Sequence, residues 1–192
     1  MTPGERRRRS AAIALLVAAV ALLPAPAAAE VVVPPGYELQ VLDTTQGRIA
    51  KPKGWFYVHR ADKFSLHWVL SKEDTRLGQG YRTGFRIQFT PAATQAAKMP
   101  PAQFVERFIA QKQGSAQVVD QCAATRQGQF QRRCLETVED GFHILYSLFW
   151  SEELDALVVT TFGAPAGEWE QARRIADRMN EFELLGADFW KR

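Results

Sequence analysis

The segment HILYSLFW at residues 143–150 decides the fold, together with ALVVTTF at 156–162, which follows it after the loop SEELD. Residues 143–150 alternate between two faces, and both faces are apolar. One face carries Ile144, Tyr146, Leu148 and Trp150, and the other carries Leu145 and Phe149. A strand that is apolar on both faces is covered on both faces. We therefore expect a hairpin of central strands that lies beneath helices.

Further strands are predicted on the N-terminal side of this hairpin. Residues 84–90 place Phe85, Ile87 and Phe89 on one face and polar side chains on the other, which is the alternation of a half-buried strand. Residues 55–59 and 64–70 are expected to form an early hairpin, and residues 37–42 a first strand. Another hairpin is expected from about residue 116 to about residue 137, around a turn at Gln127-Gly128.

Two helices are predicted to cover the sheet. One opens at Pro100-Pro101, where the missing amide donors cost nothing, and stops near Gly114. The other spans about residues 167–180, where apolar side chains recur at helical spacing. The fold class is therefore α+β: a mainly antiparallel sheet of about six to eight strands flanked by two or three helices, an α-β-α sandwich.

The first 29 residues have the order of a secretory signal peptide. Four arginines, Arg6 to Arg9, precede the uncharged apolar run at 11–23, and Ala27-Ala28-Ala29 gives a small-residue cleavage pattern. The alternative is a transmembrane anchor, but thirteen residues span only about 20 Å as a helix, short of a ~30 Å hydrocarbon core. We expect a signal peptide at 1–29, one globular domain at 30–192 with no membrane span, and a periplasmic or secreted location.

The charge of the chain argues against nucleic acid as a partner. The formal net charge is +3, from 24 basic and 21 acidic residues. The predicted leader holds four arginines and one glutamate, so 20 basic and 20 acidic residues remain after its removal. A nucleic-acid footprint needs basic residues clustered on the folded part, and the sequence has no such run.

The two cysteines, Cys122 and Cys134, flank the predicted Gln127-Gly128 turn. A hairpin centred there places them opposite each other, with Cβ atoms about 4.5–5.5 Å apart, close to what a disulfide needs. In an exported protein such a pair is oxidised. The alternative is a redox or metal-binding pair, which the absence of a CxxC motif disfavours.

No catalytic motif stands out in the sequence. It has no GxSxG, no HExxH and no phosphate-binding glycine motif. The candidate metal ligands are His59, His67 and His143, of which the first two can approach each other across the early hairpin. The alternative interpretation makes them hydrogen-bonded strand or surface histidines, and it is the one we favour. We expect no cofactor.

Aromatic residues are concentrated in the early hairpin. Most of them are expected in the core, but Trp and Tyr also favour binding interfaces. Trp55, Tyr57 and Trp68 are the candidates for an exposed binding surface.

The order of predicted elements resembles that of the PsbP-like and DcrB-like α-β-α sandwiches, over about residues 37–185. The local residues that carry the resemblance are Pro52-Lys53-Gly54-Trp55 and the block LDALVVTTF at 154–162, which leads to Glu168-Trp169. The resemblance implies a mostly non-enzymatic accessory or binding protein. It transfers no metal-binding or ligand-binding residue to this chain.

The leading hypothesis is therefore an exported, disulfide-containing, non-catalytic binding or accessory protein whose partner is an unknown protein or small ligand. One alternative is a small periplasmic hydrolase or metal-dependent enzyme that uses the histidines with a nearby acid such as Asp62. The other is an inhibitor or immunity-type protein.

Overall fold

The computed structural model describes residues 33–186. The predicted signal peptide at 1–29 lies outside this part of the chain. None of the helices within residues 33–186 is long and apolar enough to cross a membrane.

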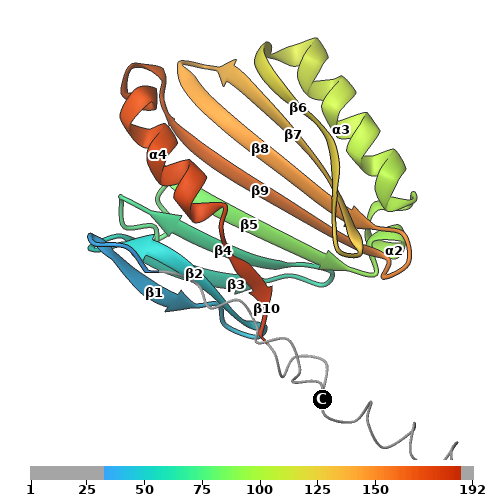
Figure 1. Ribbon diagram of the computed structural model, residues 1–192, viewed down its shortest axis with the longest axis horizontal. Helices are drawn as coiled ribbons and strands as arrows, with labels where there is room; N and C mark the ends of the chain where they lie inside the picture. The colour runs from blue at the N-terminus through green and yellow to red at the C-terminus, as the bar shows by residue number, and fades with distance from the viewer. Residues whose placement is uncertain (1–32, 187–192) are drawn as a thin grey trace, which may run out of the picture. The chain divides into compact units, whose positions relative to one another are not determined.

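The described residues form two antiparallel sheets and a few helices (Figure 1). The large sheet has seven strands in the order β3-β4-β5-β9-β8-β7-β6, and the small sheet has three in the order β1-β2-β10. The strands are β1 (Tyr37–Val41), β2 (Gln46–Pro52), β3 (Phe56–Ala61), β4 (Leu66–Ser71), β5 (Gly84–Pro91), β6 (Gln117–Gln127), β7 (Phe130–Glu139), β8 (Phe142–Ser151), β9 (Ala156–Pro165) and β10 (Glu183–Leu185). The helices are α2 (Ala93–Ala97), α3 (Pro101–Ser115) and α4 (Trp169–Met179), and a 3-10 turn, η2 (Ala166–Glu168), precedes α4. The predicted α+β class is confirmed.

The hairpin predicted at the centre of the sheet is β8 and β9, and it is covered on both faces. Leu145 and Phe162 pack into one core, while Tyr146, Leu148 and Leu157 pack into the other. The first core lies between the large sheet, α4 and the small sheet, and the second lies between the large sheet, α2 and α3. Figure 1 shows α4 crossing in front of the large sheet.

The small sheet joins segments from opposite ends of the described chain. Strand β2 pairs with β1 beside it in sequence and with β10, where Arg48 lies opposite Glu183 and Gln46 opposite Leu185. Only glycine fits at Gly47, since a Cβ atom there would lie 2.2 Å from a backbone oxygen of β10. Of this sheet the sequence predicted only β1, so β2 and β10 are additions.

The cysteines lie where the sequence placed them. Cys122 on β6 is directly opposite Cys134 on β7, and a disulfide joins them. Strand β6 also has two register shifts, one on each side of Cys122. The disulfide therefore fastens an irregular edge strand to the sheet.

A buried carboxylate fastens α4 to the large sheet. Glu136 on β7 is 5% exposed, and its Oε1 accepts a hydrogen bond of 3.1 Å from Nε1 of Trp169. Arg173, one helical turn further along α4, forms an ion pair with Oε2. The Nε2 atom of His143 lies 2.7 Å from Oε1, and the His143 ring stacks on Trp169 with centroids 4.1 Å apart. Three side chains thus meet one carboxylate at the helix–sheet boundary.

Candidate functional site

Trp68 does not belong to any exposed surface, so this part of the predicted aromatic surface is wrong. Its side chain is fully buried in the first core, and its Nε1 donates a hydrogen bond of 3.1 Å to the backbone oxygen of Asp43. The alternation in residues 64–70 correctly predicts one apolar face. It cannot tell that α4 and the small sheet bury that face.

Trp55 and Tyr57 are half-buried and pack against the same core. The Tyr57 hydroxyl donates to a carboxylate oxygen of Asp43 at 3.1 Å and accepts from the Asp43 amide at 2.9 Å. Burial raises the pKa of Tyr57, and the charge of Asp43 adds to the increase. Tyr57 therefore anchors the turn between β1 and β2.

The three histidines are placed in different surroundings. His59 lies opposite Trp68 and His67 lies opposite Arg60, so consecutive pairing puts the two histidines on opposite faces of the sheet. In sheet order, β8 with His143 is four steps from β3, roughly 19 Å at about 4.8 Å per step. Zinc–nitrogen bonds are only about 2 Å long. No cluster of three metal-ligating side chains occurs in residues 33–186.

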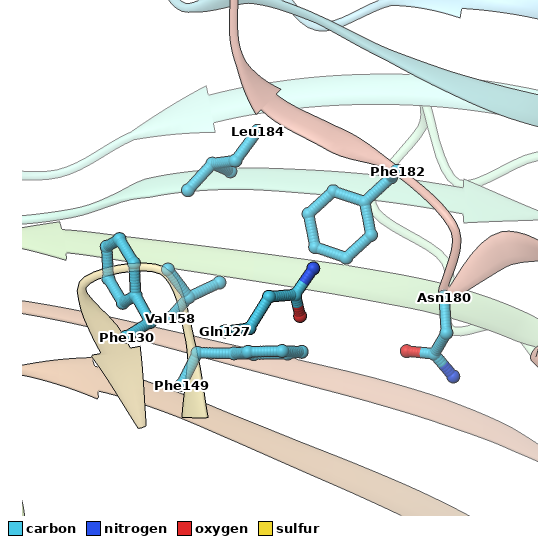
Figure 2. Close-up of a pocket in the computed structure, with 7 residues that line it drawn as sticks. All are labelled: Gln127, Phe130, Phe149, Val158, Asn180, Phe182 and Leu184. Carbon is cyan, nitrogen blue, oxygen red and sulfur yellow. The ribbon is translucent and has the colours of Figure 1, made fainter. Parts of the chain in front are cut away.

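The candidate binding site is a pocket that the sequence did not predict, hereafter the apolar pocket. It lies between the tip of the β6–β7 hairpin, the large sheet and the C-terminal segment that follows α4, and its volume is about 190 Å³. In Figure 2, Phe182 and Leu184 project from the C-terminal segment toward the side chains on the sheet. The lining residues are Gln127, Phe130, Phe149, Val158, Asn180, Phe182 and Leu184.

The apolar side of the pocket is continuous with the first core. Phe130, Phe149 and Leu184 are half-buried and pack against core residues, and Phe182 meets Phe85 edge to face with centroids 6.1 Å apart. This packing fixes the walls before any ligand arrives. The site is therefore preformed, as small-molecule sites usually are.

Polar side chains lie next to two of the lining residues, Asn180 and Phe149. Thr160 Oγ1 donates to Oδ1 of Asn180 at 3.4 Å, and Nδ2 of Asn180 donates to the last turn of α4 at 3.1 Å. Arg132 lies directly opposite Phe149 on the neighbouring strand, with its guanidinium 5.4 Å from the centre of that ring. Its Nη2 donates to the buried Ser147 hydroxyl at 3.4 Å, and its Nε atom is buried without a partner within residues 33–186. An arginine that lies over a wall residue of an apolar pocket favours an anionic group nearby.

Sequence reasoning missed this site because its residues come from four separate segments. Gln127 and Phe130 flank the predicted hairpin turn, while Asn180, Phe182 and Leu184 lie beyond the last predicted helix. Each residue type is ordinary in its own segment. The pairing of β10 with β2 and the packing of Phe182 on Phe85 hold the C-terminal segment over the sheet, and neither is visible in the sequence.

The fold and pocket define an antiparallel α+β sandwich with an apolar pocket between its large sheet and its C-terminal segment. No protein-family model matches the sequence, and no curated protein matches it. Among solved structures the chain is similar to the cyanobacterial PsbP (CyanoP) of Synechocystis sp. PCC 6803, at 14% identity and a TM-score of 0.47, over 84% of this chain and 98% of that one. It is also similar to the Ran-binding protein Mog1p of Saccharomyces cerevisiae, at 13% identity and a TM-score of 0.46, over 80% of this chain and 97% of that one. The likeness to a PsbP protein agrees with the resemblance predicted from the sequence, and it concerns the fold alone.

Proposed function

We propose that this protein is an exported, non-catalytic binding protein that holds a small carboxylate with a ring-sized apolar body in the apolar pocket. The observation that carries the proposal is the pocket itself. Five of its seven lining residues are apolar, and they surround a cavity of about 190 Å³.

The size of the cavity limits the ligand. An apolar cavity of about 150 Å³ accommodates benzene. The apolar pocket is slightly larger, so a phenyl ring or a branched alkyl group fits it. Burial of apolar surface contributes about 25 cal/mol per Å², which makes the ring the main source of affinity.

Arg132 supports the choice of an acid. Its guanidinium lies over Phe149, one of the lining residues, and no carboxylate within residues 33–186 forms an ion pair with it. A carboxylate attached to the buried ring can reach this charge. Asn180, which is itself a lining residue, offers an amide for a further hydrogen bond.

Two features support export. The arginine-rich and apolar N-terminal sequence has the order of a signal peptide. The disulfide between Cys122 and Cys134 is typical of a protein that works in an oxidising compartment. The location we propose is the periplasm or the extracellular space.

The test is a titration with three probes, followed by NMR of the methyl groups of Val158 and Leu184. Benzoate supplies ring and charge, benzyl alcohol supplies the ring alone, and acetate supplies the charge alone. We expect benzoate to shift both methyl signals, benzyl alcohol to bind more weakly, and acetate to leave them unchanged. The proposal fails if benzoate does not move these signals more than acetate does.

A matched pair of variants locates the binding. Leu184→Phe fills part of the pocket, whereas Leu154→Phe makes the same change at a half-buried leucine in the β8–β9 turn, outside the lining residues. We expect Leu184→Phe to weaken benzoate binding about tenfold or more and Leu154→Phe to leave it unchanged. Equal effects of the two variants would contradict a site in the apolar pocket.

A further inference from the structure

A second pocket lies over strands β3, β4 and β5, beside the loop of residues 72–83, on the face of the large sheet opposite α4. We call it the basic pocket. Its volume is about 410 Å³, and it is lined by Val58, Arg60, His67, Val69, Thr75, Gly78, Gln79, Gly80, Tyr81 and Arg86. None of these residues belongs to the apolar pocket or to either hydrophobic core.

The strand register arranges the floor of the basic pocket. Val58 lies opposite Val69, and Val69 lies opposite Arg86, so one row combines apolar surface with a cation. In the adjacent row Arg60 lies opposite His67. Directly opposite residues of an antiparallel sheet share a face, so all five side chains lie on the same side.

A chain of hydrogen bonds holds Arg86 in position. Its Nη2 donates to Nδ1 of His67 at 3.3 Å and to the amide oxygen of Gln88 at 3.0 Å. Arginine can only donate, so Nδ1 of His67 accepts and Nε2 carries the ring proton. That Nε2 lies 2.8 Å from Oδ2 of Asp62. This hydrogen bond, together with those from the backbone amides of Phe64 and Ser65, lowers the pKa of Asp62 to about 2. Asp62 therefore stays ionised and accepts the Nε2 proton of His67. This leaves Nδ1 of His67 free to accept the hydrogen bond that orients Arg86.

The arginines of the basic pocket are not neutralised by carboxylates. Neither Arg60 nor Arg86 forms an ion pair with another residue in 33–186. Both side chains are exposed at the pocket, so both keep donors free. Two guanidinium groups that face one pocket repel each other, and a bound anion relieves that repulsion.

The acidic residues around the pocket already have partners. Asp62 contacts His67, and Asp74 forms an ion pair with Arg76. Glu73 accepts hydrogen bonds of 3.1 and 3.2 Å from the backbone amides that precede β5. The free charge that faces the pocket is therefore positive.

Thr75 gives an independent sign of a ligand. It lines the basic pocket and is only 6% exposed, yet its hydroxyl oxygen has no hydrogen-bond partner within residues 33–186. Buried hydroxyl groups in native proteins nearly always have a partner. A ligand oxygen in the basic pocket supplies one.

We propose that the basic pocket binds a small organic oxyanion, with Arg60 and Arg86 on the charged group, Thr75 donating to it, and Val58 and Val69 beneath its carbon skeleton. The charged group is a carboxylate or a phosphate, since both accept paired donors from arginine. This site is separate from the apolar pocket and does not depend on the function proposed above.

The experiment is isothermal titration of the full mature chain with inorganic phosphate and, separately, with acetate. We expect saturable binding of one of them, weakened about tenfold or more by Arg86→Gln and by Arg60→Gln, since each removes charge-assisted hydrogen bonds. Tighter binding of phosphate identifies a phosphate ligand, and tighter binding of acetate identifies a carboxylate. Failure of both anions to bind overturns the proposal.

Three further variants distinguish binding in the basic pocket from binding to surface charge in general and from binding in the apolar pocket. Arg107→Gln removes an exposed arginine from α3, and an equal loss of binding in that variant would mean attraction to surface charge in general. Thr75→Val keeps the shape of Thr75, and we expect it to weaken binding while the melting temperature stays the same or rises. Leu184→Phe, which fills the apolar pocket, is expected to leave anion binding unchanged. If it alone weakens that binding, the anion occupies the other pocket and this proposal is wrong.

Discussion

The buried carboxylate of Glu136 makes the most demanding prediction about stability. In the Glu136→Gln variant one carboxylate oxygen becomes an amide nitrogen, which donates hydrogen bonds and cannot accept them. If that nitrogen replaces Oε2 it faces Nη1 of Arg173, and if it replaces Oε1 it faces Nε1 of Trp169 beside Nε2 of His143. Arg173 and Trp169 are both donors, so either placement brings two donors together. The variant therefore loses one interaction and places two donors together in a site that is nearly closed to water.

The magnitude follows from the contacts. A hydrogen bond to a charged group contributes roughly 1.5–3 kcal/mol. The side chain of Arg173 is 39% exposed, so water replaces part of what this residue loses, whereas the side chain of Glu136 is only 7% exposed. We expect a loss of about 2–3 kcal/mol, which lowers the melting temperature of a domain of this size by roughly 5–10 °C.

The assay is thermal unfolding followed by circular dichroism, with Glu106→Gln as the control. Glu106 also pairs with an arginine, Arg133, at 2.7 Å, but its side chain is 65% exposed. A surface pair of this kind contributes about 0–1 kcal/mol. The reasoning is refuted if Glu136→Gln melts within the range of the control, because the helix would then be held to the sheet by apolar packing alone.

Three further predictions concern other parts of the fold. Gly47→Ala is expected to destabilise the small sheet strongly, because the added Cβ atom would lie 2.2 Å from a backbone oxygen. Gly163→Ala is the control and is expected to be tolerated, because the atom nearest to its added Cβ is 3.9 Å away. Urea unfolding measures the stability of both variants. Removal of the disulfide by Cys122→Ser with Cys134→Ser, which opens a loop with a sequence separation of 12, is expected to cost about 2–3 kcal/mol in the same assay. Burial raises the pKa of Tyr57, so its proton is held more tightly in the folded state than in the unfolded state, and stability falls as the pH rises above about 10. Tyr57→Phe is expected to reduce this alkaline loss in unfolding curves recorded at successive pH values, and an unchanged loss contradicts the assignment.

The parts of the fold that the sequence predicted are those with a local pattern. The central hairpin has apolar residues on both faces, and α3 and α4 have apolar stripes at helical spacing, so each segment alone indicates its structure and its burial. The disulfide was predictable for the same reason, since a turn between Cys122 and Cys134 sets their register. Local periodicity carries all of these inferences.

The small sheet has no such pattern. Strand β10 has three residues, too few to show any period, and β2 contains a glycine, an arginine and a lysine. Lys51 is 5% exposed, and its charge is met by the Glu38 carboxylate and by the backbone oxygen of Trp55. Tertiary pairing makes these segments strands, and a single sequence does not display that pairing.

The candidate sites were unpredictable for a related reason. Both pockets are assembled from segments that meet only after folding, and their polar groups are single residues rather than motifs. His67 illustrates the limit. The sequence indicated it as a candidate metal ligand. The structure places it between Asp62 and Arg86, where its ring is hydrogen-bonded to the carboxylate on one side and accepts a hydrogen bond from the guanidinium on the other.

The small sheet combines strands from both ends of the described chain, and this makes the protein suitable for fragment complementation. Arg48 and Glu183 meet across that sheet although 135 positions separate them in the chain. A cut in the loop of residues 72–83 would leave β1 to β4 on one fragment and β5 to β10 on the other, so neither fragment could complete the small sheet. The apolar pocket, whose C-terminal wall depends on that sheet, would then exist only where the two halves have come together. A reporter built on this division would respond to the proximity of whatever proteins the halves were fused to.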